Sequence, residues 1–147
     1  MILILSDSHN QPINLDLSKY DSIIHAGDFG ISFDMLKNNN VYFVLGNCDF
    51  RYDLDSEKQF EIENKKIFLT HGHLYRVKET LNNIYFKAKS LNIDICIFGH
   101  THIQTYFKED NITFINPGAY KDGYYAIIDN NNLLFYKDNK LINKYNL

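Results

Sequence analysis

The sequence predicts an α/β fold built on mixed β-sheets, and three features of the 147-residue chain point to it. Short apolar runs, typical of buried strands, recur along the first hundred residues. Residues 74–90 space their apolar side chains at i, i+3 and i+4, as an amphipathic helix does. Pairs of apolar runs separated by turn residues indicate β-hairpins in the second half. Strands that alternate with helices and then with hairpins are typical of mixed sheets.

The predicted strands of the first half are continuous apolar runs at residues 2–5, 22–24, 41–45, 66–69 and 95–98. Continuous rather than alternating runs indicate strands that are buried on both faces. The connection between the first two strands is short and contains Pro12, so we expect any helix there to be stunted. A short helix is expected at residues 33–37, in addition to the one at 74–90.

Two hairpins are expected. The first turns at Asn64-Lys65, because asparagine tolerates the positive φ of a tight turn. The second joins residues 124–129 to 133–137 through three asparagines at 130–132. This last hairpin is apolar on both faces, so it could belong to the core or pair with a second subunit in a homo-oligomer. With no linker or repeat in the sequence, we expect residues 1–147 to form a single domain.

Composition argues against several classes of function. The net charge is −3 and the lysines are scattered, which disfavours a dedicated nucleic-acid surface. The N-terminus, MILILSDSHN, lacks a cationic region and a long apolar run, so we expect no signal peptide or membrane span and a cytoplasmic location. Cys48 and Cys96 lie far apart without CxxC spacing, and we expect free thiols.

Polar clusters follow the predicted strands directly, and together they contain all six histidines. They are SDSHN (6–10), HAGDFG (25–30), LGNCDF (45–50), LTHGHL (69–74) and FGHTHI (98–103). Functional groups of open α/β sheets gather outside the carboxyl ends of the strands, so we expect these clusters to meet. In the last of them His100 and His102 stand at i and i+2, which places both imidazoles on one side of an extended segment.

The ligand types in these clusters favour divalent metal ions. Seven side chains qualify: Asp7, His9, Asp28, Asn47, His71, His100 and His102. Carboxylates, imidazoles and an amide without thiolate suit Mn²⁺, Fe²⁺ or Zn²⁺. Seven ligands are too many for one ion, and a carboxylate can bridge two, for which Asp28 is the natural candidate. Two divalent ions bring four positive charges and the two aspartates offset two, so the site stays cationic and favours a phosphate ester.

The motifs D-x-H at 7–9, G-D at 27–28, G-N-x-D at 46–49, H-G-H at 71–73 and G-H-x-H at 99–102 resemble those of the calcineurin-like metallophosphoesterase superfamily, in the same order. The small single-domain phosphodiesterases of bacteria and archaea are the most similar branch, over residues 1–120. The resemblance implies a sandwich of two facing mixed β-sheets flanked by helices. It implies one metal held by Asp7, His9, Asp28 and His102, and a second held by Asp28, Asn47, His71 and His100.

The same resemblance suggests roles for further residues. Asn47 and Asp49 are expected at the catalytic centre, Asp49 either orienting a catalytic residue or holding the GNCD loop. Asn10, His25, Cys48 and His73 are expected around the metals or near the phosphate, with packing or capping as the alternative for both histidines. Cys48 stands where many members have the histidine that protonates the leaving group.

The function predicted from these residues is hydrolysis of a small phosphate ester, a diester above all, by a hydroxide that bridges two metal ions. Mn²⁺ is the expected ion, with Fe, Ni or Zn as alternatives. Two other readings stay open: a non-catalytic protein-binding scaffold on the same fold, as in a retromer subunit, and a phosphomonoesterase. Retention of all seven ligand positions favours catalysis over a scaffold.

Overall fold

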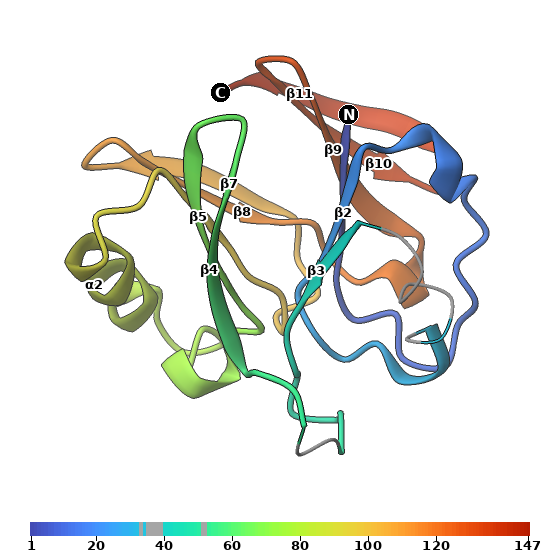
Figure 1. Ribbon diagram of the computed structural model, residues 1–147, viewed down its shortest axis with the longest axis horizontal. Helices are drawn as coiled ribbons and strands as arrows, with labels where there is room; N and C mark the ends of the chain where they lie inside the picture. The colour runs from blue at the N-terminus through green and yellow to red at the C-terminus, as the bar shows by residue number, and fades with distance from the viewer. Residues whose placement is uncertain (33, 35–39, 51–52) are drawn as a thin grey trace.

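The computed structural model describes residues 1–32, 34, 40–50 and 53–147 and consists of two mixed β-sheets that face each other (Figure 1). The six-stranded sheet has the order β11 (Lys140–Asn146), β10 (Asn132–Lys137), β9 (Tyr124–Asp129), β1 (Ile2–Leu5), β2 (Ser22–His25) and β3 (Val41–Phe43). The five-stranded sheet has the order β4 (Glu57–Ile62), β5 (Lys65–Thr70), β6 (Ile95–Ile97), β8 (Ile112–Asn116) and β7 (Thr105–Glu109). The predicted sandwich is confirmed.

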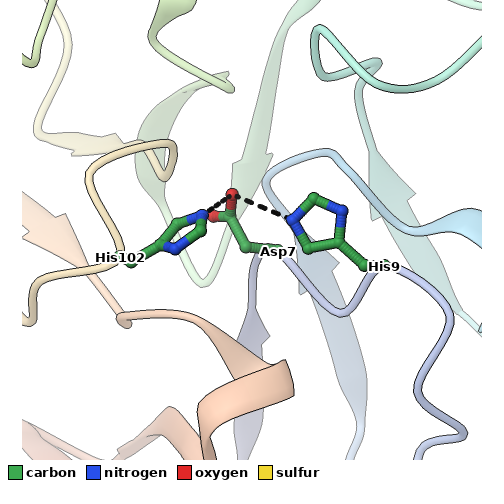
Figure 2. A group of neighbouring side chains, drawn as sticks. All are labelled: Asp7, His9 and His102. Atoms are coloured by element: carbon green, nitrogen blue, oxygen red, sulfur yellow. Dashed lines mark ion pairs between the residues drawn. The ribbon is translucent and has the colours of Figure 1, made fainter.

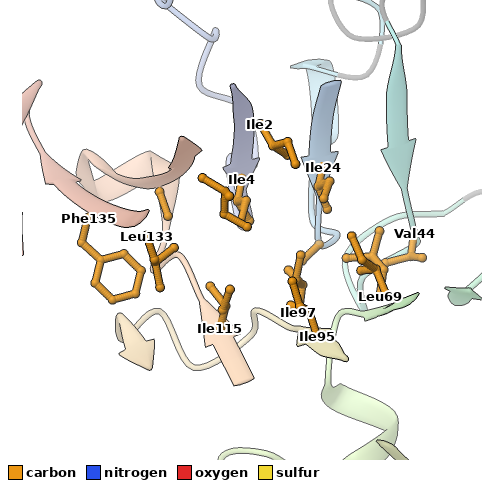
Figure 3. Close-up of a cluster of buried hydrophobic side chains, with 14 residues drawn as sticks. Ile2, Ile4, Ile24, Val44, Leu69, Ile95, Ile97, Ile115, Leu133 and Phe135 are labelled. Carbon is orange, nitrogen blue, oxygen red and sulfur yellow. The ribbon is translucent and has the colours of Figure 1, made fainter. Parts of the chain in front are cut away.

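The main core lies between the two sheets, where aliphatic side chains from their inner faces interdigitate (Figure 3). Alternate residues of β1 divide between the two faces, as the period of two requires. Ile2 and Ile4 point into this core, whereas Leu3 and Leu5 pack in a separate cluster on the outer face with Ile23. All four residues of β1 are buried, so the continuous apolar run is explained by a strand covered on both sides.

A helix covers the outer face of the five-stranded sheet, but it is shorter than predicted. The helix α2 spans Asn82–Ser90 and buries Ile84 and Ala88. The expected start at Leu74 is wrong, because Arg76 has φ 54°, in the left-handed region, which no α-helix passes through. Residues 73–75 form one 3-10 turn instead. Val77 still packs in the same cluster as Ile84, which explains the helical spacing of the sequence.

The outer face of the six-stranded sheet is covered by the connection between β1 and β2. This segment contains only a 3-10 turn, η1 (Leu17–Lys19), within the stunted region that was predicted. Ile13 is buried in the cluster with Leu3 and Leu5, so the connection covers the sheet without a full helix. The short helix expected at 33–37 lies mostly outside the described residues.

Three of the four hairpins among the described residues turn at two residues with positive φ, whereas in the Asn130-Asn131 turn only Asn130 has positive φ. The first turn is Glu63-Asn64, one residue earlier than predicted, because Ile62 pairs with Lys65. The turn between β9 and β10 is Asn130-Asn131, since Asn132 already pairs with Asp129. Two more hairpins, β7–β8 and β10–β11, turn at residues 110–111 and 138–139, which are Asp-Asn in both cases. Two residues with positive φ are the signature of a type I′ turn.

Both faces of the β9–β10 hairpin are used inside the chain. Leu133 and Phe135 join the core between the sheets, and Tyr125 and Ile127 join the outer cluster. Apolar side chains of the neighbouring strand β11, Leu141 and Ile142, are exposed. The homo-oligomer expected through the β9–β10 hairpin stays a prediction. Within the described residues, no helix is long and apolar enough to cross a membrane.

The topology brings the loops after five strands to one edge of the sandwich. Strands β1, β2 and β3 are parallel neighbours, and so are β5, β6 and β8. The carboxyl ends of parallel neighbours meet at the same edge. Figure 1 shows the loops after β1, β2, β3, β5 and β6 along the lower side of the molecule. These five loops carry the polar clusters.

Candidate metal centre

Four of the five loops bring six of the seven predicted ligands together: Asp7, His9, Asp28, His71, His100 and His102. Backbone hydrogen bonds join the loops, such as His9 N to Asp28 O at 2.7 Å and Gly99 N to His71 O at 3.0 Å. The seventh, Asn47, is exposed, and its Nδ2 donates to Cys48 Sγ at 3.4 Å. Its place as a ligand stays a prediction.

Asp7 is fully buried. One of its carboxylate oxygens is held by hydrogen bonds, and the other faces the histidine cluster. Oδ2 accepts from Ser6 Oγ at 2.5 Å and from the backbone amide of His100 at 3.0 Å. Oδ1 is buried and has no hydrogen-bond partner among the described residues. It lies 3.0 Å from His102 Nε2 and 4.0 Å from His9 Nε2, on opposite sides in Figure 2. A buried carboxylate oxygen that lacks a hydrogen-bond donor and lies between imidazoles favours a bound cation.

Asp28 is built in the same way. Its Oδ1 accepts from the backbone amide of Cys48 at 2.8 Å. Its Oδ2 lies 3.8 Å from His9 Nε2 and 3.3 Å from His71 Nε2. It therefore faces one histidine from each of the two predicted metal sites. Burial would raise the pKa of Asp28, but the hydrogen bond and charge of His71 hold this pKa well below its usual value. The carboxylate is therefore ionised at neutral pH.

His71 is oriented by the backbone. Its Nδ1 lies 2.6 Å from the carbonyl oxygen of Ala26 and must donate to it, so Nε2 faces the aspartates. Burial alone would lower the pKa of His71, but the hydrogen bond to Asp28 and the charges of Asp7 and Asp28 raise it above its usual value. The two carboxylates that raise this pKa also make the position in front of Nε2 favourable for a cation.

His100 completes the group from the neighbouring loop. Its Nδ1 lies 3.2 Å from His71 Nε2, and the two ring centroids are 5.0 Å apart. Burial and the charge of His71 lower the pKa of His100 to about 4. The ring is therefore neutral at pH 7, which is the form that binds metal.

The backbone at the ligands is strained. Asp7, His9, Asp28, His100 and His102 all have positive φ, between 49° and 68°. For residues other than glycine this conformation costs on the order of 1 kcal/mol each, and it persists only where surrounding contacts enforce it. Gly46 permits part of this packing, because a Cβ there would lie 2.1 Å from Asp28 Oδ1.

The carboxylate of Asp49 joins the loops that carry Asp28 and Asn47 by hydrogen bonds to backbone amides of both. Its Oδ2 accepts from the backbone amides of Asp28 at 2.7 Å and Gly46 at 2.8 Å. Its Oδ1 accepts from the amides of Phe29 at 3.1 Å and Gly30 at 3.3 Å. These four hydrogen bonds correspond to one of the two roles expected for Asp49, which is to hold the GNCD loop. A direct catalytic role stays a prediction.

The other residues singled out in the sequence lie around the cluster. His25 is buried, accepts from Gly27 N through Nδ1, and contacts Ser8 Oγ at 2.8 Å through Nε2, so it supports the ligand loops from below. Burial and His71 lower the pKa of His25 to about 3. The ring of His73 is 5.5 Å from that of His71, and its Nδ1 has no partner among the described residues. Asn10 is exposed beside His9.

Cys48 lies close to two predicted ligands, His9 and Asp28, in the folded chain. Its Sγ, a nitrogen of His9 and an oxygen of Asp28 lie within 4.8 Å of one another. Burial and the negative charge of Asp28 raise the pKa of the Cys48 thiol. A protonated thiol is a weak acid at neutral pH. Cys96, in contrast, is buried in the cluster beneath α2.

Two supporting residues were missed by the sequence reasoning. Ser6 donates to Asp7 Oδ2, as described above, and Asn116 holds the G-H-x-H loop. Nδ2 of Asn116 donates to Gly99 O at 2.9 Å and to Thr101 Oγ1 at 3.0 Å. A polar residue at the end of the strand next to β6 was the available signal, since such a strand ends at the same edge as the ligand loops.

The residues present fit divalent metal ions. Two groups of donor atoms within 4.8 Å consist of carboxylate and imidazole alone: Asp7 with His9 and His102, and Asp7 with Asp28 and His71. A third group adds the Cys48 thiol to His9 and Asp28. Asp7 Oδ1 supplies a buried oxygen without a hydrogen-bond partner among the described residues, whose charge a metal ion would neutralise. Hard oxygen and borderline nitrogen donors match Mn²⁺, Fe²⁺ and Zn²⁺.

Comparison with known proteins agrees with this fold and site. The family model of the calcineurin-like phosphoesterase superfamily domain matches residues 1–131. The probable metallophosphoesterase YsnB of Bacillus subtilis (strain 168) is 36% identical over 124 residues, which cover 80% of this chain and 73% of that protein. Phosphodiesterase MJ0936 of Methanocaldococcus jannaschii is 30% identical over 141 residues, covering 78% and 81%.

Solved structures share the fold over nearly the whole chain. A predicted phosphoesterase from Streptococcus pneumoniae TIGR4 has a TM-score of 0.80 at 24% identity, with 99% of this chain and 97% of that chain covered. Vps29 of Entamoeba histolytica complexed with zinc has a TM-score of 0.76 at 21% identity, covering 99% and 98%. At these identities the likeness shows the fold alone.

The chain belongs to the calcineurin-like phosphoesterase superfamily. It is a metal-dependent phosphoesterase, and its Asp and His clusters could hold the metal ions.

Proposed function

We propose that the protein hydrolyses phosphodiesters at a centre of two metal ions bridged by Asp28. The observation that carries the proposal is the position of Asp28 Oδ2, at 3.8 Å from His9 and 3.3 Å from His71. One carboxylate oxygen thus faces two groups of ligands. Asp7, His9, Asp28 and His102 would hold one ion. Asp28, Asn47, His71 and His100 would hold the other.

The residues of the chain prepare this centre before any substrate arrives. Backbone amides and Ser6 fix one oxygen of each aspartate, which leaves the other oxygen aimed at the cluster. Asp49 fixes the loop that carries Asp28. When bound, the ions offset the charge of the phosphate and lower the pKa of water so that a nucleophile exists near neutrality. Mn²⁺ is the proposed ion, which the oxygen and imidazole donors suit.

The leaving group must receive a proton. Among the predicted residues, Cys48 is the candidate proton donor. Its Sγ lies beside His9 and Asp28. Because its pKa is raised, the thiol gives up a proton reluctantly. We therefore expect esters with acidic leaving groups, which need little protonation, to react fastest.

Two alternatives give different results in the same assay. The likeness to Vps29 keeps a protein-binding scaffold open, and the metals alone do not separate a monoesterase from a diesterase. The name of the relative MJ0936, a phosphodiesterase at 30% identity, supports diesters. The convergence of six carboxylate and imidazole side chains favours catalysis over a scaffold, which would not need them.

The experiment is hydrolysis of a panel of matched esters after loading with Mn²⁺. Bis(4-nitrophenyl) phosphate and 4-nitrophenyl phosphate share a leaving group and differ in ester class. We expect the diester to react with the higher kcat/KM, and EDTA to abolish the reaction. A higher kcat/KM for the monoester would favour a phosphomonoesterase. No hydrolysis of either by metal-loaded protein would favour the scaffold.

A further inference from the structure

Exposed apolar side chains gather beside the predicted metal ligands. Among the described residues, four exposed large hydrophobic side chains follow a predicted ligand within three positions: Ile31, Phe50, Leu74 and Ile103. Phe50 is 86% exposed and Ile103 is 67% exposed. Single exposed apolar residues are ordinary on a protein surface, but four that each closely follow a predicted ligand of one site point to an apolar ligand. The metal centre accounts for none of them.

A hollow of about 310 Å³ opens beside two of the histidine loops. It is lined by Val77, Leu81, Phe98 and Ile103, together with Lys78 and threonines. Ile103 directly follows His102. The opposite wall is joined to the His71 loop, since a Cβ added at Gly72 would lie 2.8 Å from Val77. The hollow therefore borders both histidine loops, and Thr101, which lies between His100 and His102, is part of its lining.

Hydrogen bonds hold the wall of the hollow that carries Ile103. The amide of Ile103 donates to Thr101 Oγ1 at 3.2 Å, and Thr105 Oγ1 donates to the carbonyl of Ile103 at 3.1 Å. Thr101 is itself held by Asn116. Ile103 thus stays exposed on a fixed loop, and a preformed apolar surface of this kind is typical of small-molecule sites.

The size and charge of the region suit the organic part of a phosphate ester. An engineered apolar cavity of about 150 Å³ binds benzene, so a hollow twice that size admits an aryl ring or a short alkyl chain. Lys78 lines the hollow, and its charge is near enough to His100 to help lower the pKa of that histidine, after burial and His71. A cation in the lining of the hollow suits a ligand with an anionic head and an apolar tail.

We propose that this hollow is a subsite for an apolar ester group, so that the enzyme prefers phosphate esters that carry an aryl or alkyl substituent. Ile103 is the residue that determines this preference most directly. The inference deepens the proposed function and rests on it, because the phosphate itself must bind at the metals.

The test is a methyl NMR titration of the zinc-loaded protein with two non-hydrolysable ligands, phenylphosphonate and methylphosphonate. Both should bind, with phenylphosphonate about tenfold tighter, which is the scale of discrimination that a small apolar pocket achieves. Only phenylphosphonate should shift the methyl resonances of Val77, Leu81 and Ile103. Zinc is chosen because it is diamagnetic, and the readout does not depend on turnover.

Two variants make the test specific. Ile103→Asn should reduce the preference for phenylphosphonate at least threefold. Phe86→Asn is the matched control, because Phe86 is 64% exposed on α2 outside the hollow, and it should leave the preference unchanged. Both side chains are exposed, so neither change should prevent folding.

Several results would overturn the subsite. These are equal affinity for the two phosphonates, aryl-induced shifts confined to other methyl groups, or an unchanged preference in Ile103→Asn. A wild-type dimer that Ile103→Asn converts to a monomer in sedimentation would assign the surface to a second copy instead. Failure of the proposed function looks different: neither phosphonate would bind, and bis(4-nitrophenyl) phosphate would not be hydrolysed by the Mn²⁺ form.

Discussion

Replacing Asp49 with asparagine should destabilise the protein and weaken metal binding, although Asp49 is not a predicted ligand. Its two oxygens accept from four backbone amides, those of Asp28, Gly46, Phe29 and Gly30. An asparagine side chain has one oxygen and one NH₂ group, and the NH₂ would face two amide donors whichever way it is turned. The smaller loss occurs when the longer bonds, to Phe29 and Gly30, are sacrificed.

The magnitude follows from the number of bonds lost. A hydrogen bond to a charged group contributes about 1.5–3 kcal/mol, so two lost bonds give about 3–6 kcal/mol. Because Asp49 is partly exposed, we expect the lower end, about 3 kcal/mol. The loop of Asp28, which holds φ 58°, then loses a contact that enforces its strained backbone. Metal affinity should fall with it.

Urea unfolding in EDTA measures the stability term without metal linkage, and calorimetry with Mn²⁺ measures the affinity. Asp94→Asn is a matched control: Asp94 accepts through one oxygen, from the Lys66 amide at 2.8 Å, and asparagine retains one acceptor. It should cost less than about 1 kcal/mol. An Asp49→Asn protein with wild-type stability and metal affinity would refute the loop-holding role. If such a protein were also inactive, Asp49 would act in catalysis directly.

Three further predictions concern single side chains. Asp28→Ala should abolish activity and weaken both metal sites together, whereas His102→Ala should weaken mainly one; calorimetry that finds two normal sites in Asp28→Ala would place the bridge elsewhere. Cys48→His, which introduces an imidazole beside His9 and Asp28, should raise the rate for alkyl leaving groups by about 10²-fold relative to nitrophenyl esters. An unchanged ratio at equal metal loading would remove position 48 from leaving-group protonation. Burial raises the pKa of Tyr125 to about 12, above the value of about 10 in an unfolded chain. Between pH 10 and 12 the folded state retains a proton that the unfolded state loses, so the free energy of unfolding falls as pH rises through this window. The absorbance difference between wild type and Tyr125→Phe should titrate near pH 12; a midpoint near 10 would contradict this.

The strands and the location of the site could be predicted because their signals are local. An apolar run such as ILIL at 2–5 indicates a strand buried on both faces, and the polar residues that follow it indicate a functional edge. The pairing of β1 with β9, whose residues lie more than 120 positions away, is not a local signal. The strand β11 also lacked a local signal in the sequence, because its residues are mostly exposed and polar.

The errors have identifiable physical causes. The helix was predicted too long because Val77 has the spacing of an amphipathic helix, but the left-handed backbone at Arg76 interrupts it. The turns at residues 110–111 and 138–139 were missed, although Asp-Asn is a dipeptide that tolerates positive φ at both positions.

Residues that bind backbone amides were the hardest part of the site to predict. The ligand side chains follow from chemistry, since aspartate and histidine at strand ends indicate metal. The support of Asp7 by Ser6, and of two loops by Asp49, depends on where amide groups point in the folded chain. Side-chain patterns do not contain that information.

The central claim, a pair of ions bridged by Asp28, is tested most directly by elemental analysis of protein equilibrated with saturating Mn²⁺ and freed of unbound metal. The arrangement of Asp7, Asp28 and the four histidines predicts about two manganese ions per chain. A content of no more than one ion per chain under saturating Mn²⁺ would contradict the bridged pair.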